Sequence, residues 1–105
     1  MIKHIVGWNF ADEAEGRSKN DNIAEVKRRL DALPALMEGL LAFEVTAAQP
    51  ELEASFDLLL YSEFTDVDAL QAYATHPEHV AVAQLIGAVR SGRAAFDYDP
   101  EGLLP

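Results

Sequence analysis

Cysteine is absent from the 105-residue sequence, which excludes disulfides, thiolate nucleophiles and cysteine metal sites. Although 50% of the residues are hydrophobic, no run approaches the roughly 18 consecutive apolar residues that predict a membrane span. The first ten residues also lack the basic start and long apolar run of a signal peptide. We therefore expect a soluble, cytoplasmic protein that does not associate with membranes.

Basic residues are scarce, because eight Lys and Arg stand against eighteen Asp and Glu, for a formal net charge of −10. Such an excess of acid repels phosphate backbones and anionic membrane surfaces. The acidic residues are scattered and form no block, which favours solubility over recognition of a basic partner. The sequence also contains no Gly-rich phosphate-binding loop and no stretch in which aromatic residues alternate with basic ones. We therefore expect no nucleic-acid partner.

The pattern of apolar residues predicts four strands and three helical segments. Strands are indicated by alternation between two faces, and helices by apolar residues every three or four positions. The expected strands are Met1–Phe10, Leu40–Ala47 (with Leu41, Phe43 and Val45 on one face), Ser55–Phe64 and Arg93–Asp99. The expected helices run from between Ser18 and Asn22 to about Leu33, from Asp66 to about Thr75, and from a corner at Pro77 to about Val89, with Gly92 as the stop.

The resulting order, β-α-β-β-α-β, is the ferredoxin-like pattern of the α+β class, in which helices cover one side of an antiparallel sheet. We expect a single domain at residues 1–99 and a C-terminal tail at 100–105. The side without helices should be polar in a monomer. Because this side carries Ile5, Leu59 and Tyr61, the sequence predicts a homodimer packed sheet to sheet.

Residues 73–79, Tyr-Ala-Thr-His-Pro-Glu-His, combine a helix break, a helix start and two imidazoles beside a phenol. Proline has no backbone N–H and belongs in the first turn of a helix, so the chain turns a corner at Pro77. Thr75 and Glu78 have the spacing of a capping box for the new helix. This places His79 in its first turn, on the apolar face, while Tyr73 points inward from the helix before.

His79 and Tyr73 are suited to taking a proton from the carbon beside a carbonyl group. Imidazole is a base near neutral pH, and an aligned phenol can assist at the oxygen that becomes negative. The alternative is a structural role, with His79 hydrogen bonded to Tyr73 or to a strand carbonyl. His76, next to Pro77, is expected to be an exposed or cap-region residue.

Other polar residues leave their roles open. His4 could form a third polar wall of a pocket or be a satisfied core residue. The three histidines show no His-x-x-x-His or His-carboxylate pattern on one element, so we expect no metal and no cofactor. Arg90 and Arg93 could steer an anionic ligand or could simply favour the dipole at a helix end.

Five segments carry a family resemblance when taken together in order: Met1–Val6, Leu33-Pro34, Phe56–Phe64, Leu70–Val80 and Phe96–Tyr98. The sequence resembles the stress-responsive alpha/beta-barrel (Dabb) domain family over nearly all of residues 1–99. The resemblance implies a dimeric ferredoxin-like protein in which two sheets close a barrel.

The best-defined chemistry in that family belongs to the plant polyketide cyclase that closes olivetolic acid by an aldol reaction without metal or organic cofactor. The resemblance places its acid/base tyrosine and histidine on Tyr73 and His79, and another pocket histidine on His4. Two positions differ, since Leu58 replaces a further pocket histidine and Val26 replaces a pocket tyrosine. The substrate pocket is therefore expected to differ, and the cyclase's substrate is not carried over.

The sequence thus predicts an apolar pocket for a small apolar or carbonyl-containing ligand, lined by His4, Val6, Trp8, Val26, Leu58, Leu60, Tyr73 and His79. One function for it is cofactor-free acid/base chemistry of the cyclase or lyase kind. A second is a non-catalytic stress-response or interaction module. A third is an antibiotic-biosynthesis-type monooxygenase on the same dimeric fold. The corner motif at residues 73–79 does not support this third function.

Overall fold

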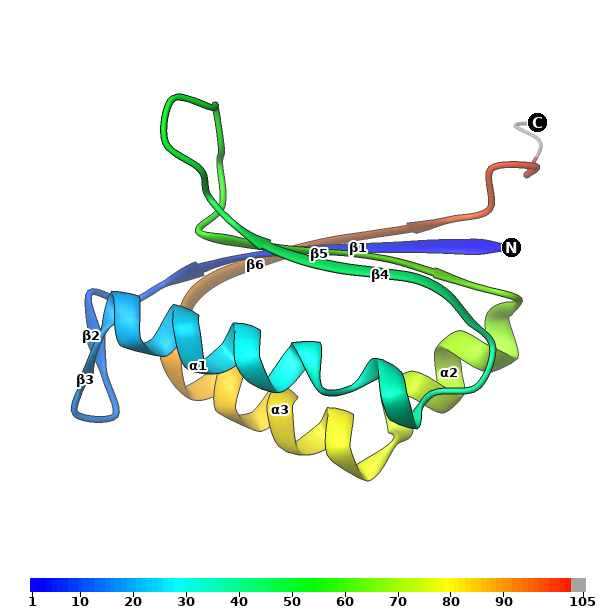
Figure 1. Ribbon diagram of the computed structural model, residues 1–105, viewed down its shortest axis with the longest axis horizontal. Coiled ribbons are helices and arrows are strands. Elements are labelled where there is room, and N and C mark those ends of the chain that lie inside the picture. The colour runs from blue at the N-terminus through cyan, green and yellow to red at the C-terminus, as the bar shows by residue number, and fades with distance from the viewer. Residues whose placement is uncertain (103–105) are drawn as a thin grey trace.

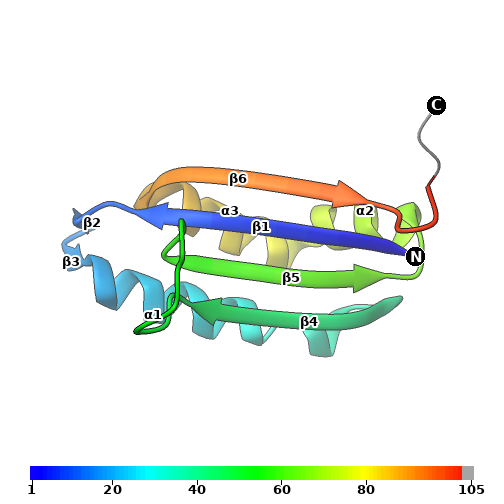
Figure 2. The same ribbon diagram turned by 90° about the horizontal axis from the view of Figure 1, so that it is seen from above.

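An antiparallel sheet with helices against one face forms the framework of the protein (Figure 1). The structure is a computed structural model that describes residues 1–102, so the last part of the expected tail at 100–105 lies outside the described residues. The sheet contains β1 (Ile2–Phe10), β4 (Leu40–Ala47), β5 (Leu58–Phe64) and β6 (Arg90–Tyr98), in the order β4-β5-β1-β6. Figure 2 shows the four strands side by side, with the helices behind them.

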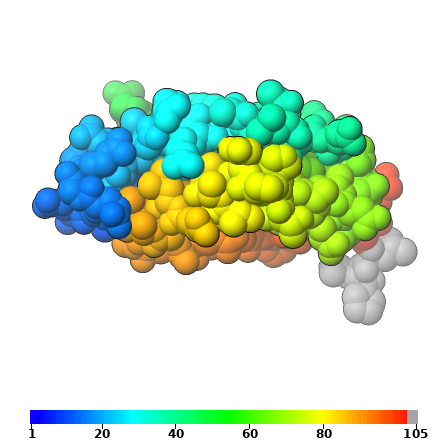
Figure 3. All heavy atoms as spheres, turned by 90° about the horizontal axis from the view of Figure 1, so that it is seen from below, coloured from blue at the N-terminus to red at the C-terminus, as the bar shows by residue number. Residues whose placement is uncertain are grey.

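Three helices and two short elements complete the fold. They are the hairpin β2 (Glu13–Ala14) and β3 (Arg17–Ser18), α1 (Lys19–Asp31), the 3-10 turn η1 (Pro34–Leu36), α2 (Val67–Thr75) and α3 (Pro77–Val89). Seen from the helix side, α1 and α3 lie along each other, and α2 continues beyond the start of α3 (Figure 3). This is the ferredoxin-like α+β fold that the sequence predicts. No helix within residues 1–102 is long and apolar enough to cross a membrane.

The core lies between the sheet and the helices, where the two hydrophobic periodicities meet. Alternate residues of β1 and β5 face the helices, and Val6 stands opposite Leu60 in the strand pairing. The helices contribute residues spaced by three or four positions, as an apolar helix face requires. The buried core consists of Val6, Trp8, Phe10, Val26, Leu30, Leu33, Val45, Leu58, Leu60, Phe64, Tyr73, Val82, Ile86 and Val89.

The corner between α2 and α3 differs from the expected capping box. His76 is the N-cap of α3, and its ring Nδ1 accepts a hydrogen bond from the Glu78 backbone N–H at 3.1 Å. Thr75 stays in the last turn of α2, where its hydroxyl donates to the Gln71 carbonyl at 2.9 Å. The reason is Pro77, because the residue before a proline is pushed out of the helical region, and an extended residue is what an N-cap needs.

Two further expectations about the strands are wrong. A register shift between Leu40 and Ala42 interrupts the alternation in β4, so Leu40 and Phe43 both pack against the core while Leu41 is 56% exposed. The chain also passes directly from α3 into β6 at Arg90, which is already extended. Gly92 therefore lies within β6 and does not terminate the helix.

The sheet face away from the helices carries apolar and aromatic side chains. We call it the outer face, and define it by Ile5, Leu59, Tyr61, Phe96 and Tyr98, which follow the strand pairing on β1, β5 and β6. Leu59 is 38% exposed and Phe96 68%. The loop at residues 48–57 rises above this side of the sheet (Figure 1). Its Phe56 ring sits so close to Gly7 that a Cβ there would meet ring atoms at 2.5 Å.

Candidate functional site

A cavity of about 300 Å³ lies between the sheet and the helices. Six of the eight residues expected in the pocket line it, namely His4, Val6, Trp8, Leu60, Tyr73 and His79. Helix α3 contributes more of the wall than expected, through Val82, Ala83, Ile86 and Gly87. These residues recur at helical spacing from His79, so the periodicity that identified the core face also marks this wall.

Val26 and Leu58 do not line the cavity, which corrects the expected pocket. Both side chains are fully buried in the core. Leu30, one turn further along α1 than Val26, lines the cavity instead. The resemblance to the cyclase pointed to both positions, but apolar side chains there pack into the core and leave the space nearer α2 and α3 open.

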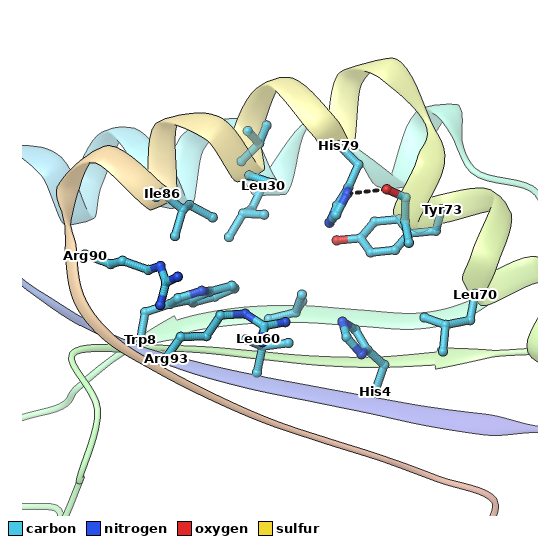
Figure 4. Close-up of a pocket in the computed structure, with 15 residues that line it drawn as sticks. His4, Trp8, Leu30, Leu60, Leu70, Tyr73, His79, Ile86, Arg90 and Arg93 are labelled. Atoms are coloured by element: carbon cyan, nitrogen blue, oxygen red, sulfur yellow. Dashed lines mark hydrogen bonds between the residues drawn. The ribbon is translucent and has the colours of Figure 1, made fainter.

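His79 lies in the first turn of α3, and one of its ring nitrogens is committed to the backbone. Its Nδ1 lies 3.0 Å from the carbonyl oxygen of Ala74 (Figure 4). A carbonyl oxygen only accepts hydrogen bonds, so Nδ1 carries the proton and, in the neutral ring, Nε2 holds a free lone pair. Burial lowers the pKa of His79 below its usual 6.5, against the opposing effect of the Ala74 hydrogen bond. The ring is therefore a neutral base at pH 7.

Tyr73 reaches the cavity from α2 and is held by other rings. It is 2% exposed, and its ring centroid lies 4.4 Å from that of His79 and 5.2 Å from that of Phe64. The hydroxyl is buried and has no hydrogen-bond partner within residues 1–102. Burial raises the pKa of Tyr73 well above its usual 10. At neutral pH the group is thus a phenol with a proton to donate.

His4 forms the floor of the same end of the cavity. Its ring lies 6.2 Å from that of Tyr73, and its Nδ1 contacts the Asp97 carboxylate at 2.5 Å. Asp97 was not among the residues predicted for the site, although strand pairing places it directly opposite His4. His76, by contrast, serves as the helix cap. Within the described residues no group of three His, Cys, Asp or Glu side chains is arranged to hold a metal.

Arg90 and Arg93 line the opposite end of the cavity. Figure 4 shows the Arg90 guanidinium beside Trp8, while the Arg93 side chain extends from β6 over Leu60, on the side toward His4. Neither arginine forms an ion pair within residues 1–102. The site therefore has a base and a hydroxyl donor at one end, apolar side chains along its length and two arginines that enter from the other end.

The fold and this cavity define a ferredoxin-like α+β domain with a partly open site between sheet and helices. The chain belongs to the Dabb, or stress responsive A/B barrel, domain family, whose model matches residues 2–100. The family resemblance seen in the sequence is thereby confirmed. No match was found among curated proteins.

Solved structures agree with this assignment. A dimeric protein of unknown function with a ferredoxin-like fold from Bacteroides fragilis NCTC 9343 is 34% identical, with 93% of this chain and 94% of that chain covered and a TM-score of 0.79. A dimeric ferredoxin-like protein of unknown function from Jannaschia sp. CCS1 is 29% identical, with 93% and 97% covered and a TM-score of 0.71. An antibiotic biosynthesis monooxygenase, 18% identical with all of both chains covered and a TM-score of 0.75, shares the fold.

Proposed function

We propose that the cavity binds a small enolisable carbonyl compound and that His79 and Tyr73 catalyse proton transfer at the carbon beside its carbonyl group. The observation that carries this proposal is the pairing of a lone-pair-bearing His79 Nε2 with an unpartnered Tyr73 hydroxyl on one cavity wall. Base and donor both come from the protein, so the reaction needs no cofactor. The cyclase-like chemistry that the sequence predicts is one outcome of such a step.

The proposed step uses the two groups in opposite ways. His79 Nε2 takes a proton from the α carbon, and the electron pair of the broken C–H bond becomes the double bond of an enolate. The negative charge moves to the carbonyl oxygen, where the Tyr73 O–H donates a hydrogen bond. The enolate carbon then either takes back the proton from His79 or attacks a second carbonyl carbon, which forms a carbon–carbon bond and an alkoxide that takes the proton from His79.

The buried Tyr73 hydroxyl argues for a ligand rather than for packing alone. A buried polar group without a partner costs about 1–3 kcal/mol, and most such groups in proteins are paired. A ligand carbonyl oxygen in the cavity would accept its hydrogen bond. His79, whose ring contacts Tyr73, uses its own N–H on Ala74 and so does not compete for that oxygen.

We also propose that the protein is a homodimer formed through the outer face. That face presents apolar side chains opposite the helix layer, and an exposed apolar patch of this kind marks an interface. Two solved relatives are themselves described as dimeric. A symmetric pairing covers the same patch on both copies.

Deuterium exchange tests the proposed function without knowledge of the final product. Octan-2-one or 7-oxooctanoate is incubated with the protein in deuterium oxide, and incorporation beside the ketone is followed by NMR or mass spectrometry. We expect saturable exchange well above the buffer rate. Binding of these ketones without any catalysed exchange would contradict catalysis and support the non-catalytic binding module.

The pH dependence of exchange follows from the two pKa shifts. Exchange requires neutral His79, so kcat/KM should rise with pH and level off once the imidazole has lost its proton. Because burial lowers the pKa of His79, the midpoint should lie below pH 6.5. Because burial raises the pKa of Tyr73, the plateau should persist through pH 9. A midpoint above pH 7 would show that another group acts as the base.

A further inference from the structure

We infer that the ligand of this cavity is an organic carboxylate of medium length, bound head-first by Arg90 and Arg93 with its carbonyl carbon at the His79 end. This inference rests on the proposed function and adds the substrate class, a keto acid whose ketone is remote from its carboxylate. The guanidinium fork of arginine matches the geometry of a carboxylate.

The strand pairing and the end of α3 bring the two arginines together. Arg93 pairs with Trp8 across β1 and β6, so it shares the inner face of the sheet with a cavity-lining residue. Arg90 is the C-cap of α3, on the opposite wall. Figure 4 shows the Arg90 guanidinium beside Trp8 and the Arg93 side chain passing Trp8 and lying over Leu60. Both arginines thus reach the cavity from the start of β6, Arg90 as its first residue and Arg93 three residues later.

The helix dipole does not account for both charges. A cation at the C-terminal end of α3 is favoured by that dipole, which explains Arg90 in the absence of any ligand. Arg93 lies three residues further on, within β6, where this effect has faded. In a chain with only eight basic residues and a net charge of −10, two cavity-lining arginines that form no ion pair within residues 1–102 are a concentrated attraction for an anion.

The charges also set the direction in which such a ligand enters. Asp97 lies at the His4 end of the same strand face, four residues from Arg93, which is about 13 Å along a strand. The only arginines that line the cavity within residues 1–102 thus lie away from Asp97, so a ligand carboxylate is attracted to the arginine side. This leaves the uncharged carbonyl of the ligand for His79 and Tyr73.

The distance between the two ends bounds the length of the ligand. His79 and Ile86 are seven residues apart on α3, about 10 Å along a helix, and His4 and Trp8 are four apart on β1, about 13 Å along a strand. The side chains between them, Leu60 among them, are apolar. Because the side chains of Arg90 and Arg93 reach into the cavity, the apolar chain between carboxylate and ketone is shorter than these backbone separations and of medium length.

Binding of octanoate tests this inference, with neutral octanamide as the matched ligand. Isothermal titration calorimetry should show octanoate binding more tightly than octanamide. The double variant Arg90→Gln, Arg93→Gln should weaken octanoate binding by about 10- to 100-fold and leave octanamide unchanged. The control Arg17→Gln, Arg29→Gln removes the same net charge away from the cavity and should have little effect.

Equal affinity for octanoate and octanamide, or octanoate binding that survives the loss of Arg90 and Arg93, would overturn the inference. The proposed function has its own readout, because octan-2-one carries no carboxylate. Exchange into octan-2-one without a preference for octanoate would leave the proposed function standing and remove only the substrate class. Arginine-dependent octanoate binding without exchange into either ketone would retain the anion site and remove the catalysis.

Discussion

Replacing His79 with alanine should slow deuterium exchange into 7-oxooctanoate by about 10²- to 10⁴-fold, the usual contribution of a general base. The loss should fall on kcat, because the imidazole acts on the reacting C–H bond and makes little contact with the rest of the ligand. The side chain is only half-buried, so the fold should survive the change. Octanoate binding depends on the arginines. The affinity for octanoate should therefore fall by a smaller factor than the rate of deuterium exchange.

Two matched variants separate base catalysis from packing. His79→Gln keeps a polar side chain of similar size but no base, and should be as slow as His79→Ala. Tyr73→Phe keeps the ring and loses only the buried hydroxyl, so it should reduce kcat by about 10²- to 10³-fold if that hydroxyl holds the enolate oxygen. Because the unpartnered hydroxyl is costly in the empty protein, Tyr73→Phe should also be at least as stable as the wild type. Full exchange activity in both His79 variants would exclude His79 as the base.

Replacing Leu59 with lysine should dissociate the proposed homodimer. Leu59 lies on the outer face and is 38% exposed in a single copy, so in the dimer a charge there would be buried without a partner. Such a charge costs about 3–5 kcal/mol, which weakens the dimer by at least about a hundredfold. Analytical ultracentrifugation over a range of concentrations measures the shift from dimer to monomer.

Val80 provides the control for this substitution. It is 40% exposed, nearly the same as Leu59, but it lies on α3 in the helix layer. Val80→Lys should leave the dimer intact, because the helix layer is not part of the proposed interface. A wild-type protein that is monomeric at all concentrations, or a Leu59→Lys protein that dimerises as tightly as the wild type, would contradict the proposed interface.

Most of the fold could be predicted because local patterns decide it. The alternation of apolar residues in β1 and β5 predicts strands, and the spacing of apolar residues in α1 and α3 predicts helices. The order of these elements along the chain leads to the ferredoxin-like arrangement. The errors occurred where one backbone detail overrides the pattern. A register shift in β4 turned Leu41 outward, and the extended conformation forced on His76 by Pro77 made it the cap in place of Thr75.

The site was less predictable because a cavity depends on what packing leaves empty. The sequence identified His79 and Tyr73 from the corner and its helical faces, and the structure brings the two rings together. It could not show that Val26 and Leu58 are sealed in the core, since apolar residues look alike whether they line a cavity or fill a core. It also left Arg90 and Arg93 undecided, because their convergence depends on how α3 passes into β6.

The claim that this cavity is the reaction site is tested most directly by filling it. Gly87 lines the cavity in the last turn of α3, and a Cβ built there meets nothing within 4 Å among the described residues. Glycine is a poor residue within a helix, so Gly87→Phe should keep or slightly raise the stability of the protein. The adjacent Ala88 does not line the cavity, and Ala88→Phe is the matched control.

The decisive measurement is the rate of deuterium exchange into 7-oxooctanoate for these two variants. If His79 and Tyr73 act on a ligand held in the cavity, Gly87→Phe should lose exchange and octanoate binding together while Ala88→Phe keeps both. A folded Gly87→Phe protein that no longer binds octanoate but exchanges deuterium at the wild-type rate would place the reaction outside this cavity and contradict the proposed function.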